Sequence, residues 1–516
     1  MKAILFATLL LSIVSIYAQN PGVKVAVSPA AIKNFNDNIL PIIISKLGPI
    51  TVPDVHSGKV SVTNIVVNKF SLPSNAIVAQ FGDNSLKLGT SNFGVEISAH
   101  AQVKILFVKI GVSVTATCHD SSALADISFT YANEHPQISV KNFDVSIHNL
   151  NIKFGSSIIA KAASAIVNLF KGPLAKTISS KVSSGLGATL ASHINDAIQR
   201  VPNTAEIKGS PLAVAYNLIS NPNVTPSYFS LPVDGSFYET SVGKVTPPIT
   251  PAGPMPDYDT TSGSQVQAFL NQYVFNSGLY SAWHAGMLKF EISKSLFDPA
   301  TPFKFDISWL QQFISQITQF YDLSTSLVLD VLSKNAPTLS LTKDNIGIAL
   351  TIEIALSAVV GEQKVEIFSA DCDLDLHARF DVSDWILKPS VTGGSLRSVN
   401  ITRSSVGELE GAKIQEGLNQ VANISIPRID FSIASIPLPK SLDVDMSTIS
   451  LAIQDGYIQI NANPVFIPPT ARTVQAKTEV EVENKSYWSR LLKYIGFVDS
   501  SAELELLEEN EFMGSI

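Results

Sequence analysis

Residues 247–256 read Pro-Pro-Ile-Thr-Pro-Ala-Gly-Pro-Met-Pro, and this stretch divides the 516-residue chain. Five prolines in ten residues cannot form a helix or an inner strand, because proline lacks the backbone N–H that either structure needs. The stretch is typical of a semi-rigid extended linker. It predicts two domains of similar length, residues 19–246 and 257–464, followed by a tail at 465–516 that we expect to be partly disordered.

Two helical patterns frame the first half. Ser28 can cap the first helix, and Pro29 suits its first turn. In each pattern apolar residues recur mostly at three- and four-residue steps, which predicts one apolar helix face. The first face holds Ile32, Phe35, Ile39, Ile43 and Leu47, and the second holds Ile158, Ile159, Ala162, Ile166 and Phe170.

Between these helices the apolar residues alternate with polar ones. Residues 95–105 alternate strictly, which predicts a strand with one buried face. The alternation changes phase at residues 106–108 and then continues over 110–118, so a turn or a bulge is expected there. We favour a bulge in one long strand.

The second half repeats this order of elements. Val266, Phe269, Leu270, Tyr273 and Val274 follow helical spacing, residues 346–356 alternate, and a second helical pattern runs over roughly 408–421. The repeat indicates a tandem duplication. The expected class is α+β, with twisted antiparallel sheets that each wrap a long helix.

The N-terminus predicts export. Residues 1–18 combine a charged start, an apolar core and a small residue at the cleavage point, as a secretory signal peptide does. Acceptor sequons for glycosylation agree with a secreted glycoprotein. Their asparagines are Asn223, Asn400, Asn423 and Asn484.

Charge is distributed unevenly. Residues 19–250 carry 17 basic and 12 acidic side chains, whereas residues 251–464 carry 13 and 23. A basic half on an acidic protein suggests contact with an anionic surface. The basic residues are scattered and not interleaved with aromatic ones, so we expect no nucleic-acid partner.

No catalytic motif is found, and we expect neither an enzyme nor a cofactor. The one candidate is the series Asp371, Asp373, Asp375 and His377, which falls on one face of a strand. A metal-dependent hydrolase built on it is the enzymatic alternative. Ligands about 7 Å apart along a strand seldom converge on one ion, so we predict a solvated sheet face and no metal site.

Several segments, in order, resemble the bactericidal/permeability-increasing and lipopolysaccharide-binding protein family. The resemblance covers about residues 20–464. The segments are Asn20-Pro21-Gly22, Val52-Pro53-Asp54, Phe70-Ser71-Leu72-Pro73, Val233-Asp234-Gly235-Ser236-Phe237-Tyr238 and Tyr273-Val274-Phe275-Asn276-Ser277-Gly278-Leu279.

This resemblance implies a boomerang of two barrel-and-helix domains joined by a central antiparallel sheet, each domain holding a lipid in an apolar pocket. The stripe residues named above, together with Phe269 and Tyr273, become candidates for the pockets. Plain core packing is the alternative for any one of them. The chain departs from the family because the usual first-domain disulfide is missing. Cys118 and Cys372 lie in different halves, in phase with inward-facing residues, and are expected to be buried thiols without a bridge.

The segment around the phase change also departs from the family. Antibacterial relatives carry many basic residues there, whereas here Lys104 and Lys109 flank an apolar run that includes Phe107, with Lys59 expected nearby. We predict that these four residues contact anionic head groups.

The leading hypothesis is a secreted, non-enzymatic protein that holds phospholipid or a related acyl-chain lipid for transfer or presentation. Its partners would be that lipid and a membrane or lipoprotein surface. The first alternative keeps the fold but makes the protein a lipopolysaccharide-binding defence protein of innate immunity. A structural glycoprotein with filled cores is a further alternative.

Overall fold

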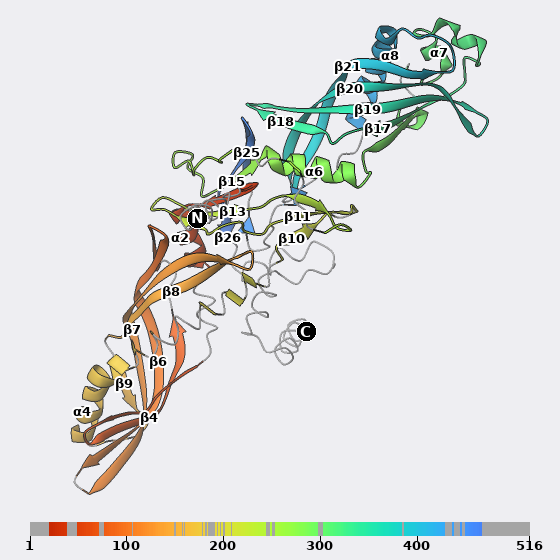
Figure 1. Ribbon diagram of the computed structural model, residues 1–516. Coiled ribbons are helices and arrows are strands. Elements are labelled where there is room, and N and C mark those ends of the chain that lie inside the picture. Colours follow the sequence, from red (N-terminus) through yellow and green to blue (C-terminus); the bar gives the residue numbers. More distant parts are fainter. Residues whose placement is uncertain are drawn as a thin grey trace, which may run out of the picture.

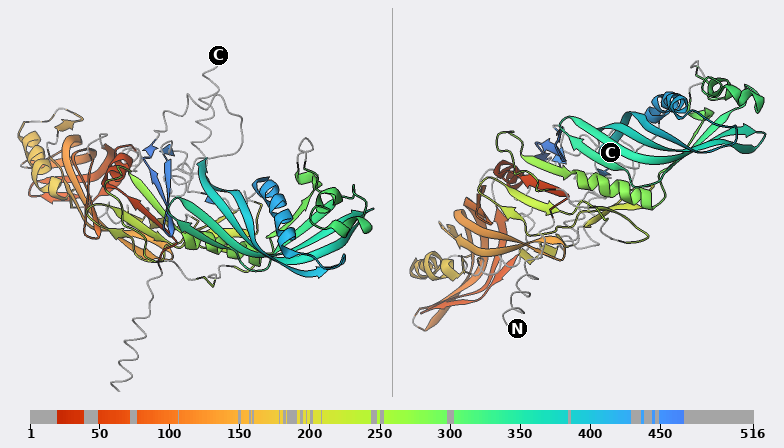
Figure 2. Two further views of the ribbon diagram at one scale, coloured as in Figure 1. Left: turned by 90° about the horizontal axis from the view of Figure 1, so that it is seen from above. Right: turned by 45° about the horizontal axis from the view of Figure 1, so that its top comes forward.

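The computed structural model describes most of residues 20–466. The segments outside the description are 1–19, 39–48, 72–76, 184–190, 298–302, 429–435, 438–443 and 467–516, with shorter gaps elsewhere. The expected signal peptide, Asn484 and nearly all of the expected tail therefore lie outside the described residues. The described chain is elongated, with a large sheet towards each end and a third at the centre (Figures 1 and 2).

The first half is built on a strongly twisted antiparallel sheet. Its main order is β2-β4-β6-β7-β8, with β3 on β4, β5 on β6 and β9 on β7. The bounds are β2 (Ile50–Val52), β3 (Val55–Ser57), β4 (Val60–Ser71), β5 (Ile77–Gly82), β6 (Ser85–Ile105), β7 (Val108–Ala132), β8 (His135–Ser146) and β9 (Asn151–Phe154).

The phase change at residues 106–108 is a hairpin turn and not the bulge we favoured. Ile105 pairs with Val108, and β6 and β7 run antiparallel from that point back into the sheet. Their alternating residues form one face of the core, as the sequence predicted. Helix α4 (Ala160–Leu169), extended by the π-turn η1 (Phe170–Leu174), packs against this face. Cys118 is a buried free thiol of the same core.

The second half repeats the plan with the sheet order β16-β17-β19-β20-β21-β22, and β18 pairs with β19. Helix α8 (Gly411–Ser425) and η4 (Ile426–Arg428) lie against β21, and the short α7 (Ile307–Leu310) lies at the far end. Cys372 is a buried free thiol of this core. The strands are β16 (Lys289–Ser293), β17 (Leu327–Ser333), β18 (Thr338–Thr342), β19 (Asn345–Val360), β20 (Gln363–Ser383), β21 (Ile386–Ser404) and β22 (Ile436–Pro437).

A central antiparallel sheet joins the halves. Its order is β12-β13-β1-β15-β25-β24, so strands from both sides of the proline-rich segment alternate within one sheet. Helix α2 (Pro29–Asn38) follows β1, and the Ser28 hydroxyl accepts a hydrogen bond from the Ala31 N–H at 3.2 Å, as the expected cap should. The strands are β1 (Val23–Val27), β12 (Asn223–Val224), β13 (Phe229–Val233), β15 (Val266–Asn271), β24 (Ile449–Gln454) and β25 (Tyr457–Ala462).

The expected helix at the start of the second half begins later than its spacing predicted. Residues 266–271 form β15, which pairs with β1 on one side and β25 on the other. Apolar residues in a sheet buried on both faces need not alternate, so their spacing also fitted a helix. Helix α6 (Gln272–His284) starts only where Asn271 caps it, accepting a hydrogen bond from the Tyr273 N–H.

A small sheet from before the proline-rich segment packs on the second half. It consists of β10 (Thr204–Glu206), β11 (Leu212–Ala215) and β14 (Phe237–Glu239). The Phe237 N–H donates to Ser277 Oγ of α6 at 2.9 Å, and Ser281 Oγ donates to the Phe237 carbonyl at 3.1 Å. The two halves are therefore interlocked beyond the central sheet.

The predicted class is confirmed: the described chain is an α+β protein of two tandem sheet-and-helix units joined by a central antiparallel sheet. A further two-strand pair links β23 (Val444–Asp445) to β26 (Val465–Phe466). None of the described helices has the length and apolar character needed to cross a membrane.

Candidate functional site

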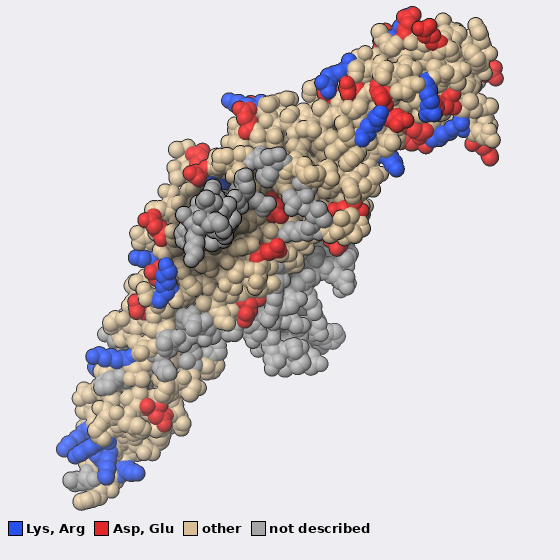
Figure 3. Space-filling model, in the orientation of Figure 1, with Lys and Arg blue, Asp and Glu red and all other residues tan. Residues whose placement is uncertain are grey.

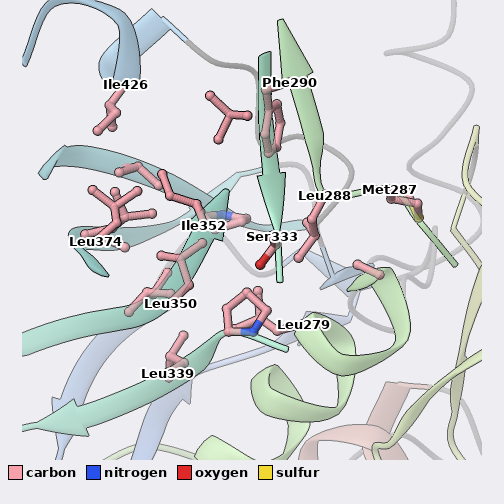
Figure 4. A pocket seen from close by; sticks show the side chains of 18 of the residues that line it. Leu279, Met287, Leu288, Phe290, Ser333, Leu339, Leu350, Ile352, Leu374 and Ile426 are labelled. Atoms are coloured by element: carbon pink, nitrogen blue, oxygen red, sulfur yellow. The ribbon is translucent and has the colours of Figure 1, made fainter. Parts of the chain in front are cut away.

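An apolar cavity of about 210 Å³ lies in the second half, bordered by its sheet, α6 and α8 (Figure 4). This is larger than an apolar cavity of roughly 150 Å³ that stays dry and binds small hydrocarbons. A cavity of this character offers a hydrocarbon ligand burial without hydration of its walls.

Two neighbouring strands supply much of the wall. Ile348 and Leu350 of β19 pair with Leu376 and Leu374 of β20, and all four side chains line the cavity. Since side chains two residues apart share a face, alternation brings both strands' apolar residues to the same side. In Figure 4, Leu350 and Leu374 lie on the left side of the cavity, and Leu279 and Leu288 lie on its right side.

One face of helix α6 lines the cavity. Phe275, Leu279 and Ala282 follow at steps of four and three residues, so their side chains share that face. The face is apolar along its full contact with the cavity. Partly exposed Met287 and Leu288, just after the helix, continue the wall.

Helix α8 supplies another wall. Leu418, Val421, Ala422 and Ser425 are buried and line the cavity at helical spacing. Gly417, also buried on this helix, lies against the Phe313 ring, which fixes how closely α8 approaches the segment after α7. The position of α8 thereby sets the width of the cavity.

The first half contributes as well. Leu212 of β11 and Phe237 of β14 precede the proline-rich segment, yet both line the cavity. Both are buried in a core cluster that also contains Leu270, Val274 and Phe275. The cavity is therefore complete only when residues from both sides of the proline-rich segment are folded together.

Among the described residues that line the cavity, the side-chain hydroxyls belong to Ser333 and Ser425. Ser333 Oγ donates to the Asn335 carbonyl at 2.8 Å. Ser425 Oγ is buried and has no hydrogen-bond partner among the described residues. No charged side chain lines the described cavity, so its chemistry favours hydrocarbon chains.

The acidic series on β20 lies on the opposite face of that strand. Asp371 pairs with Lys334 at 2.7 Å, and Asp375 pairs with Arg397 at 2.9 Å. Asp373 accepts hydrogen bonds from Ser398 and Thr351, and these lower the pKa of its carboxyl. Within the described residues, no group of three or more His, Cys, Asp or Glu side chains is arranged to hold a metal ion.

The thiol of Cys372, which lies between Asp371 and Asp373 in the sequence, is unreactive. Burial, and then the negative charges of Asp371 and Asp373, raise the pKa of Cys372 to about 12. It stays a neutral thiol at physiological pH, which fits a core residue better than a nucleophile.

Comparison with known proteins agrees with this architecture. The C-terminal domain model of the LBP / BPI / CETP family matches residues 207–466, and the N-terminal domain model matches residues 30–200. The chain belongs to the LBP / BPI / CETP family. The resemblance drawn from the sequence is thus confirmed, and with it membership of a family of lipid-binding proteins.

Individual relatives are distant but span nearly the whole chain. A bactericidal permeability-increasing protein of Sebastes schlegelii is 24% identical, covering 87% of this chain and 96% of its own length. A lipopolysaccharide-binding protein of Rattus norvegicus is 22% identical, covering 90% and 97%. A crystal structure of lipopolysaccharide binding protein matches with a TM-score of 0.50 at 16% identity, over 87% of this chain and all of that one, which supports the fold.

None of the predicted pocket residues whose side chains the structure describes lines the cavity of the second half. Ile166 and Phe170 lie fully buried in the first-half core, with Ile158 packed at its edge. Ile32 packs on a small cluster around Phe81. Ile39, Ile43, Leu47, Ile159 and the Phe35 side chain lie outside the described residues.

The two predicted pocket residues of the second half are also placed elsewhere. Phe269 is buried in the central sheet beside Ala26 and Tyr228. Tyr273 is buried at the start of α6, where burial, and then the charge of Asp234, raise the pKa of its phenol to about 12. A role for any of the predicted set in a pocket remains a prediction.

The predicted head-group residues do come together at the tip of the β6–β7 hairpin. Lys104 pairs with Lys109 across the turn, and the Lys104 N–H donates to the Lys59 carbonyl at 2.8 Å. Phe107 is 97% exposed and Val108 is 61% exposed. Figure 3 shows basic side chains gathered at this end of the molecule. We name Lys59, Lys104, Phe107, Val108 and Lys109 the basic tip.

Three of the predicted glycosylation acceptors are accessible. Asn223, Asn400 and Asn423 are all exposed, so the structure leaves room for a glycan at each.

The cavity residues that sequence reasoning missed carried only a weak signal. Nothing local shows that Leu212 and Phe237 reach a cavity of the other half. Ser425 did carry a signal, because a serine follows Leu418 and Ala422 at helical spacing on an otherwise apolar face.

Proposed function

We propose that this protein holds an acyl-chain lipid in the cavity of its second half and contacts a lipid surface with its basic tip, for transfer or presentation of that lipid outside the cell. The observation that carries the proposal is the apolar cavity walled by the strands of the second-half sheet, by helices α6 and α8, and by Leu212 and Phe237 of the first half.

Burial supplies the affinity. Each methylene group that leaves water for an apolar wall contributes about 0.8 kcal/mol. The described walls carry no charged side chain with which to hold a head group, so the head group would stay at the surface while the chains enter. Release then requires a surface that accepts the chains. The basic tip lies at the far end of the first half, away from the cavity, so its part would be to hold the protein on such a surface (Figure 1).

The direct test is native mass spectrometry of the secreted protein, followed by organic extraction and lipid identification. We expect a bound acyl-chain lipid. A protein that arrives empty and takes up no offered phospholipid would overturn the proposal.

A matched pair of variants places the lipid. Ala422→Phe puts a ring into the cavity from α8, and Ala412→Phe puts the same ring on the exposed face of that helix. We expect the first variant to lose bound lipid and the second to keep it. Equal occupancy in the two folded variants would place the lipid elsewhere.

Recognition of lipopolysaccharide is a second candidate, which the basic tip favours. Convergent cations bind phosphates of an anionic lipid, and such binding weakens with salt, whereas chain burial does not. Two relatives bear the names bactericidal permeability-increasing and lipopolysaccharide-binding protein. Binding of lipopolysaccharide that disappears in 0.5 M salt, with phospholipid occupancy unchanged, would assign that recognition to the tip.

A further inference from the structure

The Ser425 hydroxyl is the unusual group of the cavity. Ser425 is the last residue of α8, is fully buried and lines the cavity. Its Oγ has no hydrogen-bond partner in the part of the chain that the structure describes. A buried donor without an acceptor costs free energy, so a ligand that supplies an acceptor gains that free energy on binding.

The described cavity walls provide no hydrogen-bond acceptor for the Ser425 hydroxyl. The other hydroxyl of the cavity, Ser333 Oγ, already donates to the Asn335 carbonyl at 2.8 Å. A buried water typically needs two to four polar partners, and apolar walls do not provide them. The acceptor is therefore best supplied by a ligand.

The walls restrict which acceptor fits. No charged side chain is among the described residues that line the cavity, so an ionised carboxylate would be buried without a counter-charge. A pure hydrocarbon or an ether-linked chain brings no carbonyl. A neutral ester carbonyl joins an acceptor directly to an acyl chain without adding charge.

We propose that Ser425 Oγ–H donates a hydrogen bond to the carbonyl oxygen of an acyl ester and makes this cavity select ester-linked lipids over ether-linked lipids and free fatty acids. This inference rests on the proposed function, since it names a selectivity residue and a ligand class for the same cavity.

The experiment is competition for the delipidated full chain, read by native mass spectrometry. One arm offers dipalmitoyl phosphatidylcholine and its dihexadecyl ether analogue in equal amounts. A second arm offers cholesteryl palmitate and cholesteryl hexadecyl ether, which separates a phospholipid source of the ester from a neutral one. A third offers dipalmitoyl phosphatidylcholine against palmitate.

The wild-type protein is expected to favour the ester about threefold to tenfold over the matched ether in at least one arm, the range of one neutral hydrogen bond. Ser425→Ala should bring that ratio to about one without weakening ether binding. Ser425→Thr should keep the preference because it keeps the hydroxyl. Ser398→Ala is the control and should also keep it, because exposed Ser398 donates to Asp373 and is not among the residues that line the cavity.

Folding does not obscure the result. Ser425→Ala removes a buried hydroxyl that has no partner, so the thermal midpoint of the lipid-free variant should stay unchanged or rise. A loaded wild-type protein with an ester-to-ether ratio of one in both ether arms, or a preference retained by Ser425→Ala, would overturn the role of Ser425 alone. A wild-type protein that binds none of these lipids would overturn the proposed function, and this inference with it.

Discussion

The two long hairpins of the molecule end very differently. At the β6–β7 turn Lys104 and Lys109 flank the exposed Phe107, and Lys59 of the β3–β4 turn lies beside Lys104. No ion pair joins these lysines to another described residue. At the β19–β20 turn Val360 is half exposed, but Lys364 lies 3.0 Å from Glu291 and 2.9 Å from Asp330. One hairpin keeps its cations available to a partner, whereas the other neutralises its own.

The corresponding helices differ in the same way. Helix α4 buries Ala162, Ile166 and Leu169 in a packed core, whereas α8 turns its apolar face to a cavity. Among the described residues, the distinctive surface of the first half is therefore external, at the basic tip, and that of the second half is internal, at the cavity. Each prediction below tests part of this difference.

The largest expected effect concerns α4, which packs in a core, and α8, which lines the cavity. Ile166→Ala should lower the free energy of unfolding by about 3–4 kcal/mol, because it removes packed core atoms. Leu418→Ala should cost about 2 kcal/mol, because its side chain already borders empty space. Urea unfolding measures both.

The two halves can be followed separately in that experiment. Three of the four tryptophans, Trp283, Trp309 and Trp385, lie in the second half and none lies in the first, so a change of fluorescence follows the second half while circular dichroism reports on the whole chain. If Leu418→Ala cost as much as Ile166→Ala, the wall of the cavity would be as tightly packed as the first-half core.

The next effect concerns the hairpin tips. Each lysine near an anionic surface contributes about 1 kcal/mol, so the triple variant Lys59→Gln, Lys104→Gln, Lys109→Gln should bind phosphatidylserine vesicles about 100-fold more weakly. Vesicle co-sedimentation at low salt measures this. Lys364→Gln is the control at the other tip and should bind as the wild type does. Undiminished binding by the triple variant would show that the basic tip does not contact membranes.

The sequence predicted elements whose pattern is local. Strict alternation located β6, β7 and β19, and helical spacing with a Ser-Pro start located α2. It failed at residues 266–271, where the strand exists because β1 and β25 flank it, and those partners are distant in the chain. Periodicity reports which face is apolar and says nothing about what covers that face, which is why a packed core and a cavity gave the same stripe.

The basic tip was predicted better than the cavity for the same reason. Lys104, Phe107 and Lys109 lie within six residues, and a hairpin turn brings them together without any distant contact. The cavity needs Leu212 and Phe237 to meet α6, which depends on the tertiary fold.

Smaller effects on stability are expected from alanine substitutions at two helical glycines, Gly417 and Gly172. A Cβ at Gly417 would lie 2.9 Å from the Phe313 ring, so Gly417→Ala should destabilise the second half by about 2 kcal/mol. At Gly172 after α4, no described atom outside its own helix and its chain neighbours lies within 4 Å of a Cβ, but Pro173 follows and disfavours the helical conformation for a residue that has a Cβ. Gly172→Ala should therefore change the free energy of unfolding by less than about 1 kcal/mol, because this restriction offsets the lower entropy of alanine in the unfolded chain.

The fluorescence of Trp309 is well placed to report the first of these changes, because its ring lies 5.4 Å from that of Phe313. A neutral Gly417→Ala would mean that α8 and the Phe313 segment can separate freely, and the cavity would then be adjustable in width.

The smallest expected effect on stability concerns Asp257, which follows the proline-rich segment and contacts Lys24 of β1. The hydrogen bond from Lys24, followed by that from the Tyr228 hydroxyl, lowers the pKa of Asp257. A lowered folded pKa contributes stability above the unfolded carboxyl pKa of about 3.9, and this contribution is lost as pH falls through the folded value. The Asp257 side chain is 80% exposed, so solvent screening keeps the effect below about 1 kcal/mol.

Asp257→Asn should therefore lower the thermal midpoint slightly at pH 7 and hardly at all at pH 2.5. Calorimetry at the two pH values measures the difference. A deficit of equal size at both would assign the effect to packing and not to charge.

The strand order of the central sheet determines when that sheet can form during synthesis of the chain. Strand β1 emerges first, yet its neighbours β13 and β15 follow some 200 or more residues later, and β25 completes the sheet only at residue 462. At roughly 5–20 residues per second the ribosome needs on the order of 20–90 s to reach that point. During this interval the backbone hydrogen-bonding groups along both edges of β1 have no strand partner, and unpaired edges of this kind are prone to pairing with other chains.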